Sequence, residues 1–188
     1  LSLHDALPIL PWFDAVSAIL YVGLSGQAGA SATVRALTGQ INPSGRLAET
    51  WPISYADCPS ASWYPAIGRD AIYREGPFVG YRYYETTNVP VRFPFGYGLS
   101  YATFTYSDLT ADETGVQFTV TNDSDVSGAT VAQLYVSGPS EGVLRPAREL
   151  KGFAKVQLDA RESKTVRIEF DRYTFRHFDT AEIGRAHV

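Results

Sequence analysis

The stretch Val116-Gln117-Phe118-Thr119-Val120-Thr121 (116–121) alternates apolar and polar side chains at every position. Because successive side chains of a β-strand point to opposite faces, this period of two predicts a strand with one buried and one solvated face. The same alternation returns at residues 165–170, where Val166, Ile168 and Phe170 are separated by polar residues. Two half-buried strands of this kind favour antiparallel sheets that pack together on one face.

Two further strands are predicted between these, at Ala129–Val136 and Lys151–Leu158. Turn-forming pairs separate the four strands, and they lie at residues 122–123, 127–128, 138–139 and 159–160. Short strands punctuated in this way indicate an all-β, immunoglobulin-like sandwich. The absence of a Cys–Trp–Cys pattern disfavours an antibody-type domain.

The chain before the sandwich has a different pattern, from Leu10 to Ser100, and predicts α/β structure. Apolar residues at helical spacing follow Pro11, and residues 18–22 are predicted to form a short buried strand. The glycine-containing loop 23–27 then leads into a predicted helix at residues 28–38, ended by Gly39. Such a strand–loop–helix unit places its loop where α/β sheets bind ligands. The Gly23–Gly29 stretch is therefore a candidate edge for binding hydroxyl groups, but the favoured interpretation is a tight turn with close helix packing.

An aromatic and charged segment, Tyr73–Glu85, precedes a linker at Phe93–Ser100. We expect its four charged residues to form salt bridges that pin the segment between the two domains; they are Arg74, Glu75, Arg82 and Glu85. The alternative is a sugar site in which Glu75 and Arg74 bind substrate beside aromatic faces. A later charged group is predicted to be a solvated rim, and it comprises Arg145, Arg148, Glu149 and Lys151.

Composition excludes several classes of protein. Hydrophobic residues make up 45% of the 188 residues and charged residues 19%, which is typical of a packed chain. A net charge of −4 and a pI near 5.3 argue against nucleic-acid or anionic-membrane partners. No apolar run approaches the roughly 20 residues that span a bilayer. The single cysteine, Cys58, has no partner for an internal disulfide.

The sequences of the two terminal segments do not continue the patterns of the residues next to them. Leu1–Ile9 and Glu182–Val188 resemble the translation of common sequencing adapters, so residues 1–9 and 180–188 are predicted to be non-native. Two of the three histidines, His4 and His187, lie there, and His177 alone supports neither a catalytic triad nor a metal cluster. No cofactor or metal is predicted, and the cellular compartment is left open.

Several motifs together resemble one enzyme family, in the family's own order along the chain. They are Gly26-Gln27-Ala28-Gly29, Asn42–Leu47 with Trp51-Pro52, Glu75–Tyr84, Phe95–Tyr101, and Gln133–Val136 with Arg145–Phe153. This set is similar to the C-terminal part of family 3 glycoside hydrolases of the bacterial β-glucosidase type. The chain departs from the family within Tyr21–Gln27, where Trp-Xaa-Pro-Gly-Gln is usual, and at Thr38 and Gln40, where Phe and Asp are frequent.

The resemblance implies a multidomain fragment. Residues 10–100 are expected to be the C-terminal piece of the family's α/β domain with its linker, and residues 101–179 a fibronectin type III-like domain. Family members are retaining enzymes with two carboxyl groups about 5–5.5 Å apart. The resemblance places both carboxyl groups outside this chain, so no catalytic residue is assigned and the fragment alone is predicted to be inactive.

The expected partners are a carbohydrate substrate, bound through the parent enzyme, and a missing N-terminal barrel domain. The alternative function is that of a non-catalytic carbohydrate-binding or structural β-sandwich module.

Overall fold

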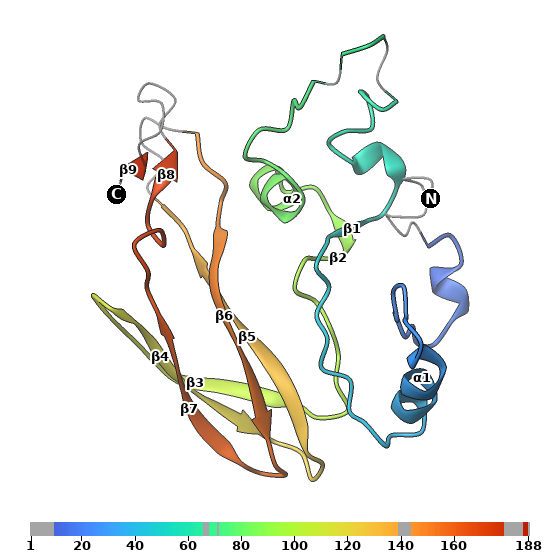
Figure 1. The fold of residues 1–188 in the computed structure, drawn as a ribbon, viewed down its shortest axis with the longest axis vertical. Coiled ribbons are helices and arrows are strands. Elements are labelled where there is room, and N and C mark those ends of the chain that lie inside the picture. The colour runs from blue at the N-terminus through green and yellow to red at the C-terminus, as the bar shows by residue number, and fades with distance from the viewer. Residues whose placement is uncertain (1–9, 66–67, 71, 139–143, 179–185, 188) are drawn as a thin grey trace.

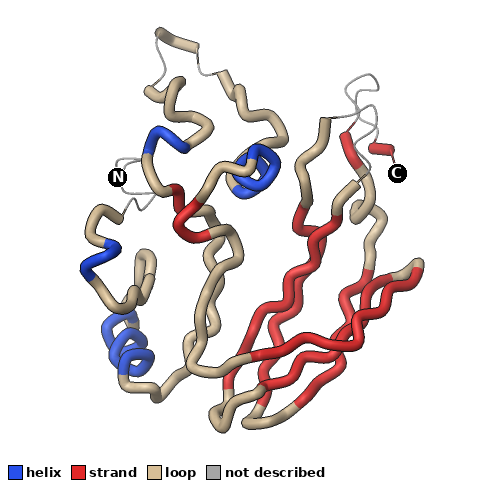
Figure 2. Tube along the Cα trace, turned by 180° about the vertical axis from the view of Figure 1, so that it is seen from behind, coloured by secondary structure: helices blue, strands red, loops and turns tan. Residues whose placement is uncertain are grey.

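The computed structural model describes residues 10–65, 68–70, 72–138, 144–178 and 186–187. The chain has two parts that lie side by side, an N-terminal part of short helices and loops and a C-terminal set of long strands (Figures 1 and 2). A two-residue pair, β8 (His177–Phe178) with β9 (Ala186–His187), closes the described chain. Residues 1–9 and most of 180–188 lie outside the described residues, so their non-native origin stays a prediction.

The C-terminal part is a sandwich of two antiparallel sheets. One sheet has the order β3 (Phe104–Asp112), β4 (Gly115–Asn122), β7 (Ser163–Glu169), and the other pairs β5 (Gly128–Val136) with β6 (Glu149–Leu158). In the register of β4 and β7, Val116 lies opposite Ile168 and Phe118 opposite Val166. The four predicted strands are therefore confirmed, whereas strand β3 was not predicted.

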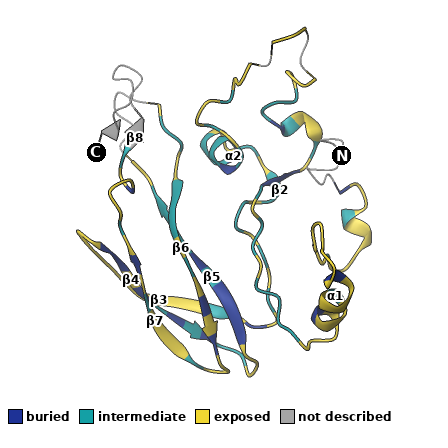
Figure 3. Ribbon diagram, viewed as in Figure 1, coloured by how far each residue is buried: buried dark blue, intermediate teal, exposed yellow. Residues whose placement is uncertain are grey.

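The alternating apolar residues supply the core between the two sheets (Figure 3). Its buried members are Val116, Phe118, Val120, Ala132, Val156, Leu158 and Ile168. Val120 and Leu158 have no exposed surface at all. Burying a side chain of this size contributes about 1.5–3 kcal/mol, so the core is the main source of stability in the sandwich.

A buried asparagine joins the turns at one end of the sandwich. The Nδ2 group of Asn122 donates to the carbonyls of Val126 (2.8 Å) and Asp159 (2.9 Å), and its Oδ1 accepts from the Ser124 N–H (3.0 Å). Asn122 is 0% exposed, and a buried amide is tolerated because its polar atoms are paired. These bonds connect two turns that are far apart in the sequence.

The N-terminal part contains the predicted small-residue helix. Helix α1 spans Gly29–Leu37, and Gly39 follows it with a φ of +75°, a conformation that glycine adopts without strain. The helix prediction at 28–38 is therefore confirmed. The hydroxyl of Tyr101 donates to the Ala36 carbonyl (2.8 Å), so the entry to the sandwich is tied to this helix.

The predicted helix and strand before α1 are wrong. Only a 3-10 turn, η2 (Phe13–Ala15), forms there, and residues 18–22 belong to no strand in the described structure. Leu20, Tyr21 and Val22 are 37–55% exposed. A buried strand needs neighbours on both edges and cover on its faces, and none of the described segments supplies them.

Short elements connect the two parts. Strand β1 (Trp51–Pro52) pairs with β2 (Val91–Phe93), the 3-10 turn η3 (Tyr55–Asp57) follows β1, and helix α2 spans Tyr81–Thr87. Asn42 also bridges the parts: its Oδ1 accepts from Ser100 Oγ (2.7 Å) and the Tyr101 N–H (2.8 Å), while its Nδ2 donates to the Ser127 carbonyl (3.1 Å).

Candidate functional site

The aromatic and charged segment lies between the two parts, as predicted, and most of its C-terminal half is helical. Helix α2 begins after Gly80, whose φ is +59°, and ends at Asn88, which has a left-handed φ of +54°. Gly80 and Asn88 are residue types that adopt positive φ values readily, so the chain can turn sharply at both ends of the helix. We call the contact between α2 and residues 147–150 of the sandwich the seam.

Two ion pairs cross the seam. Arg148 forms a two-pronged pair with Glu85, in which Nε lies 2.6 Å from Oε2 and Nη2 lies 2.6 Å from Oε1. The hydrogen bonds that Arg148 donates to the Glu85 carboxylate raise the pKa of the guanidinium above its ordinary value. Arg82 lies 3.5 Å from Glu149, a looser pair that lacks hydrogen-bond geometry at Arg82 Nε.

The remaining seam contacts are neutral. The buried Tyr81 hydroxyl accepts a hydrogen bond from the Leu150 N–H (2.7 Å), and Thr86 Oγ1 accepts one from the Ala147 N–H (2.9 Å). The Tyr81 ring stacks on Phe95 at 4.8 Å between centroids and meets Tyr135 edge-on at 5.8 Å. Charged, polar and aromatic contacts therefore converge on α2 from one strand end and one linker.

The predicted salt bridges are half right. Arg82 and Glu85 do pin the segment, but their partners are Glu149 and Arg148, which were predicted to be a solvated rim. The rim prediction missed these two ion pairs, although the Arg148 side chain is 50% exposed, because the fold brings α2 against the start of β6. Lys151 also pairs with Glu149 (3.3 Å), whereas Arg145 lies close to Gly138.

Arg74 and Glu75 are placed apart from the seam ion pairs. The Arg74 guanidinium lies over the Trp63 ring, 4.1 Å from its centroid. Glu75 is half-buried and lines a cavity of about 380 Å³ between α2 and residues 48–60. Among the described residues its carboxylate has neither a hydrogen bond nor an ion pair, so the salt bridge predicted for it does not form.

A buried thiol and phenol share the wall of this cavity. Cys58 and Tyr84 are each 5% exposed and hydrogen-bond to one another. Burial raises the pKa of the Cys58 thiol, although the hydrogen bond from Tyr84 opposes the shift. Burial also raises the pKa of Tyr84. Both groups therefore stay protonated at neutral pH, which makes Cys58 a poor nucleophile.

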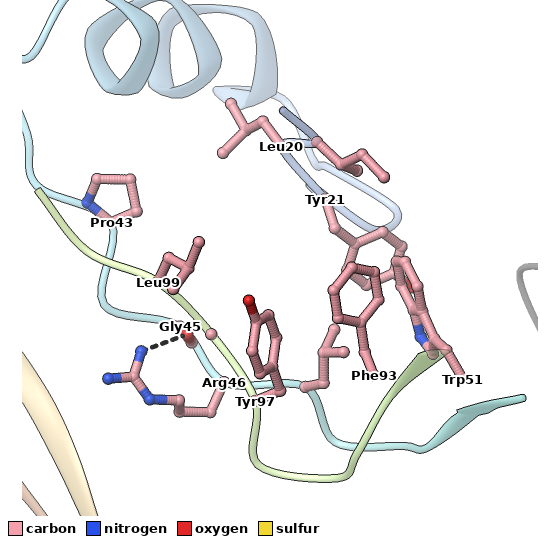
Figure 4. Close-up of a pocket in the computed structure, with 12 residues that line it drawn as sticks. Leu20, Tyr21, Pro43, Gly45, Arg46, Trp51, Phe93, Tyr97 and Leu99 are labelled. Atoms are coloured by element: carbon pink, nitrogen blue, oxygen red, sulfur yellow. Dashed lines mark hydrogen bonds between the residues drawn. The ribbon is translucent and has the colours of Figure 1, made fainter. Parts of the chain in front are cut away.

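A second pocket, of about 220 Å³, is lined in part by Trp51 of β1 and Phe93 of β2 (Figure 4). Its wall is a chain of aromatic contacts: Tyr21 meets Trp51 at 5.0 Å, Trp51 meets Phe93 at 5.7 Å, and Phe93 stacks on Tyr97 at 4.8 Å. The guanidinium of Arg46 is turned to the Gly45 carbonyl and to Thr130 Oγ1. The pocket is thus mostly apolar, and residues 19–21 form part of its lining.

The Gly23–Gly29 loop is built as a turn. Gly23 has a φ of +56°, and a side chain at Gly29 would collide with Ser25. No group of three or more His, Cys, Asp or Glu side chains that could hold a metal occurs in the described part of the chain. No helix among the described residues is long and apolar enough to cross a membrane.

Comparisons with known proteins agree with this architecture. Residues 1–101 match the model for the glycosyl hydrolase family 3 C-terminal domain, and residues 130–185 match a fibronectin type III-like domain. The match to the family 3 C-terminal domain, followed by this sandwich, defines the C-terminal region of a multidomain glycosidase. The chain belongs to glycosyl hydrolase family 3.

The relatives are glycosidases. The chain is 41% identical over 179 residues to the thermostable beta-glucosidase B of Acetivibrio thermocellus, covering 91% of this chain and 24% of that protein. It is 43% identical over 183 residues to an exo-alpha-(1->6)-L-arabinopyranosidase of Bifidobacterium breve, covering 95% and 24%. The chain therefore spans about a quarter of the length of these relatives.

Solved structures confirm the fold. A GH3 beta-glucosidase of Bifidobacterium adolescentis aligns with a TM-score of 0.86 and 42% identity, over 92% of this chain and 26% of that one. A beta-glucosidase of Kluyveromyces marxianus in complex with glucose aligns with a TM-score of 0.86 and 36% identity, over 95% and 22%. The predicted family and the predicted sandwich are confirmed, while the α/β domain is seen only in part.

Proposed function

We propose that this chain works as the C-terminal region of a retaining, β-glucosidase-like enzyme that hydrolyses O-glycosidic bonds. Within that enzyme, it braces the α/β domain and contributes none of the catalytic carboxylates. The observation that carries this proposal is the seam, where Tyr81, Arg82 and Glu85 of α2 are all held by one end of the sandwich. A sandwich fixed in this way can set the position of the α/β domain.

The catalytic chemistry is assigned to the rest of the enzyme. A retaining mechanism needs a nucleophile and a general acid/base about 5–5.5 Å apart. By the family resemblance, we propose that the nucleophile belongs to a barrel domain and the acid/base to an earlier part of the α/β domain. The domain limits are accordingly proposed as 10–100 for the α/β piece and 101–179 for the sandwich.

The exposed segment before α1 supports the proposal that the rest of the α/β domain packs against this chain. Leu24 is 89% exposed and Tyr21 is 55% exposed. Among the described residues, no backbone–backbone hydrogen bond involves residues 17–25. Unpaired backbone beside exposed apolar side chains is what a strand leaves when its neighbours in the sheet are taken away.

A hybrid enzyme tests the proposal. This chain would replace the matching C-terminal region of the Acetivibrio thermocellus beta-glucosidase B, and hydrolysis of an aryl β-glucoside would be measured. The expected result is a folded hybrid with turnover, whereas the truncated relative without the replacement is inactive. A hybrid that folds but does not turn over would overturn the proposal.

A non-catalytic carbohydrate-binding module is the second candidate. An open groove of about 720 Å³ between the sheets favours it, lined by Tyr106, Leu109, Leu134 and Tyr135. Affinity electrophoresis of the 188-residue chain in gels containing soluble β-glucan tests this function. Retardation that is lost in Tyr106→Ala would support it, and unretarded migration would exclude it.

A further inference from the structure

We propose that the cavity beside Glu75 is a binding site for one neutral, hydroxyl-rich sugar unit, separate from the seam ion pairs. The proposal rests on the proposed function, because it names a second place where the glycosidase contacts carbohydrate. The cavity lies between α2 and residues 48–60, and its volume of about 380 Å³ falls in the range of about 300–1,000 Å³ that is usual for ligand pockets.

One wall of the cavity is aromatic. Tyr81 and Phe95 both line it, and their mutual stacking together with the seam contacts of Tyr81 fixes their positions. Val79 and Pro59 extend the apolar surface. A rigid wall of this kind suits the C–H face of a sugar ring and costs little entropy on binding.

Other residues of the lining offer hydrogen-bonding groups. Glu75 presents a carboxylate with no partner among the described residues. Glu49 accepts from the Trp51 indole N–H (3.2 Å) through Oε1, which leaves Oε2 for a ligand. Ser60 also lines the cavity. Ionised carboxylates are acceptors only, so the matching ligand groups are donors such as sugar hydroxyls.

The lining also disfavours one class of ligand, anions. Among the described residues that form it, none is a lysine or an arginine, so an anionic ligand has no counter-charge. The nearest basic neighbour in the sequence, Arg74, is held over Trp63. The two acceptor carboxylates suit either neutral hydroxyl donors or a cation, and the extended aromatic and apolar wall favours the sugar.

Calorimetric titration of the 188-residue chain with cellobiose tests the inference. Glu75→Gln should weaken cellobiose binding about tenfold, because it replaces a charged acceptor by a neutral amide. Glu113→Gln is the matched control, since Glu113 lies in the exposed turn between β3 and β4. Both variants should have the same melting temperature as the unsubstituted 188-residue chain.

Three results would overturn the inference. They are the absence of saturable cellobiose binding, binding that Glu75→Gln leaves unchanged, and Glu75-dependent binding of butylammonium in place of cellobiose. An inactive hybrid enzyme would instead count against the proposed function. An active hybrid without cellobiose binding by this chain would remove only the second sugar site.

Discussion

Arg148 and Glu85 form a two-pronged ion pair across the seam, with both N–O distances at 2.6 Å, although the two residues are 63 positions apart in the sequence. The side chain of Glu85 is 22% exposed and that of Arg148 is 50% exposed. The pair is therefore partly screened by water. Its contribution to the free energy of unfolding lies between that of a surface ion pair and that of a buried one.

A double-mutant cycle measures this pair. Glu85→Gln and Arg148→Gln should show a coupling free energy of about 1 kcal/mol in urea unfolding, because the two-pronged geometry strengthens a half-exposed pair. The control cycle uses Asp125 and Arg161, which are 85% and 62% exposed in their side chains. Equal coupling in both cycles would mean that the seam pair adds nothing beyond an ordinary surface contact.

Tyr81→Phe removes the hydroxyl that accepts from the Leu150 N–H. The half-buried N–H is then left without its partner, so we expect a loss of about 1–3 kcal/mol in the free energy of unfolding. Tyr83→Phe is the control, since no hydrogen bond of the Tyr83 hydroxyl occurs among the described residues, and its ring contact with Tyr84 is kept. Similar losses in the two variants, measured by denaturant titration, would contradict the role given to the Tyr81 hydroxyl.

The contacts of Asp112 predict a fall in stability as the pH becomes acidic. The hydrogen bond from Arg167, followed by those from Thr114, lowers the pKa of Asp112 below its ordinary value of 3.8. A carboxyl with a lowered folded pKa stabilises the fold above pH 3.8, and this contribution is lost as the pH falls further. Asp112→Asn should therefore flatten the decline in melting temperature between about pH 5 and about pH 2. A decline as steep as that of Glu113→Gln would argue against the Arg167 contact.

The burial of Cys58 predicts a fall in stability as the pH becomes alkaline. Burial raises the pKa of its thiol above the ordinary 9.0, so the protonated fold is stabilised below pH 9.0 and this contribution is lost as the pH rises through the folded pKa. Cys58→Ala should reduce the alkaline fall in melting temperature. A disulfide reagent should label the folded chain far more slowly than the urea-unfolded chain at pH 8, and equal rates would show that the thiol is accessible.

Local sequence patterns predicted the parts of the fold that depend on local contacts. Strands β4 and β7 were predicted because one face of each is buried, which imposes the period of two. Strand β3 was missed because eight of its nine residues are exposed, so no alternation marks it. Helix α2 was missed because tyrosine and threonine are weak helix formers and the contacts that hold it come from the sandwich.

At the candidate site, too, the sequence could not predict contacts between residues that are far apart in the chain. The charges of Arg82 and Glu85 indicated ion pairs, but nothing in the spacing identified Glu149 and Arg148 as their partners. The strand expected at residues 18–22 has the composition of a buried strand and lacks sheet neighbours in the described structure. Its composition is explained if the neighbours belong to the longer enzyme.

The most direct test of the central claim compares two purified proteins at equal molar concentration. One is the 188-residue chain alone, and the other is the hybrid that carries this chain on the N-terminal part of the Acetivibrio thermocellus enzyme. Release of nitrophenol from an aryl β-glucoside should be proportional to the amount of hybrid and absent for the chain alone. Release by the chain alone, in proportion to its concentration, would contradict the assignment of the catalytic carboxylates to the rest of the enzyme.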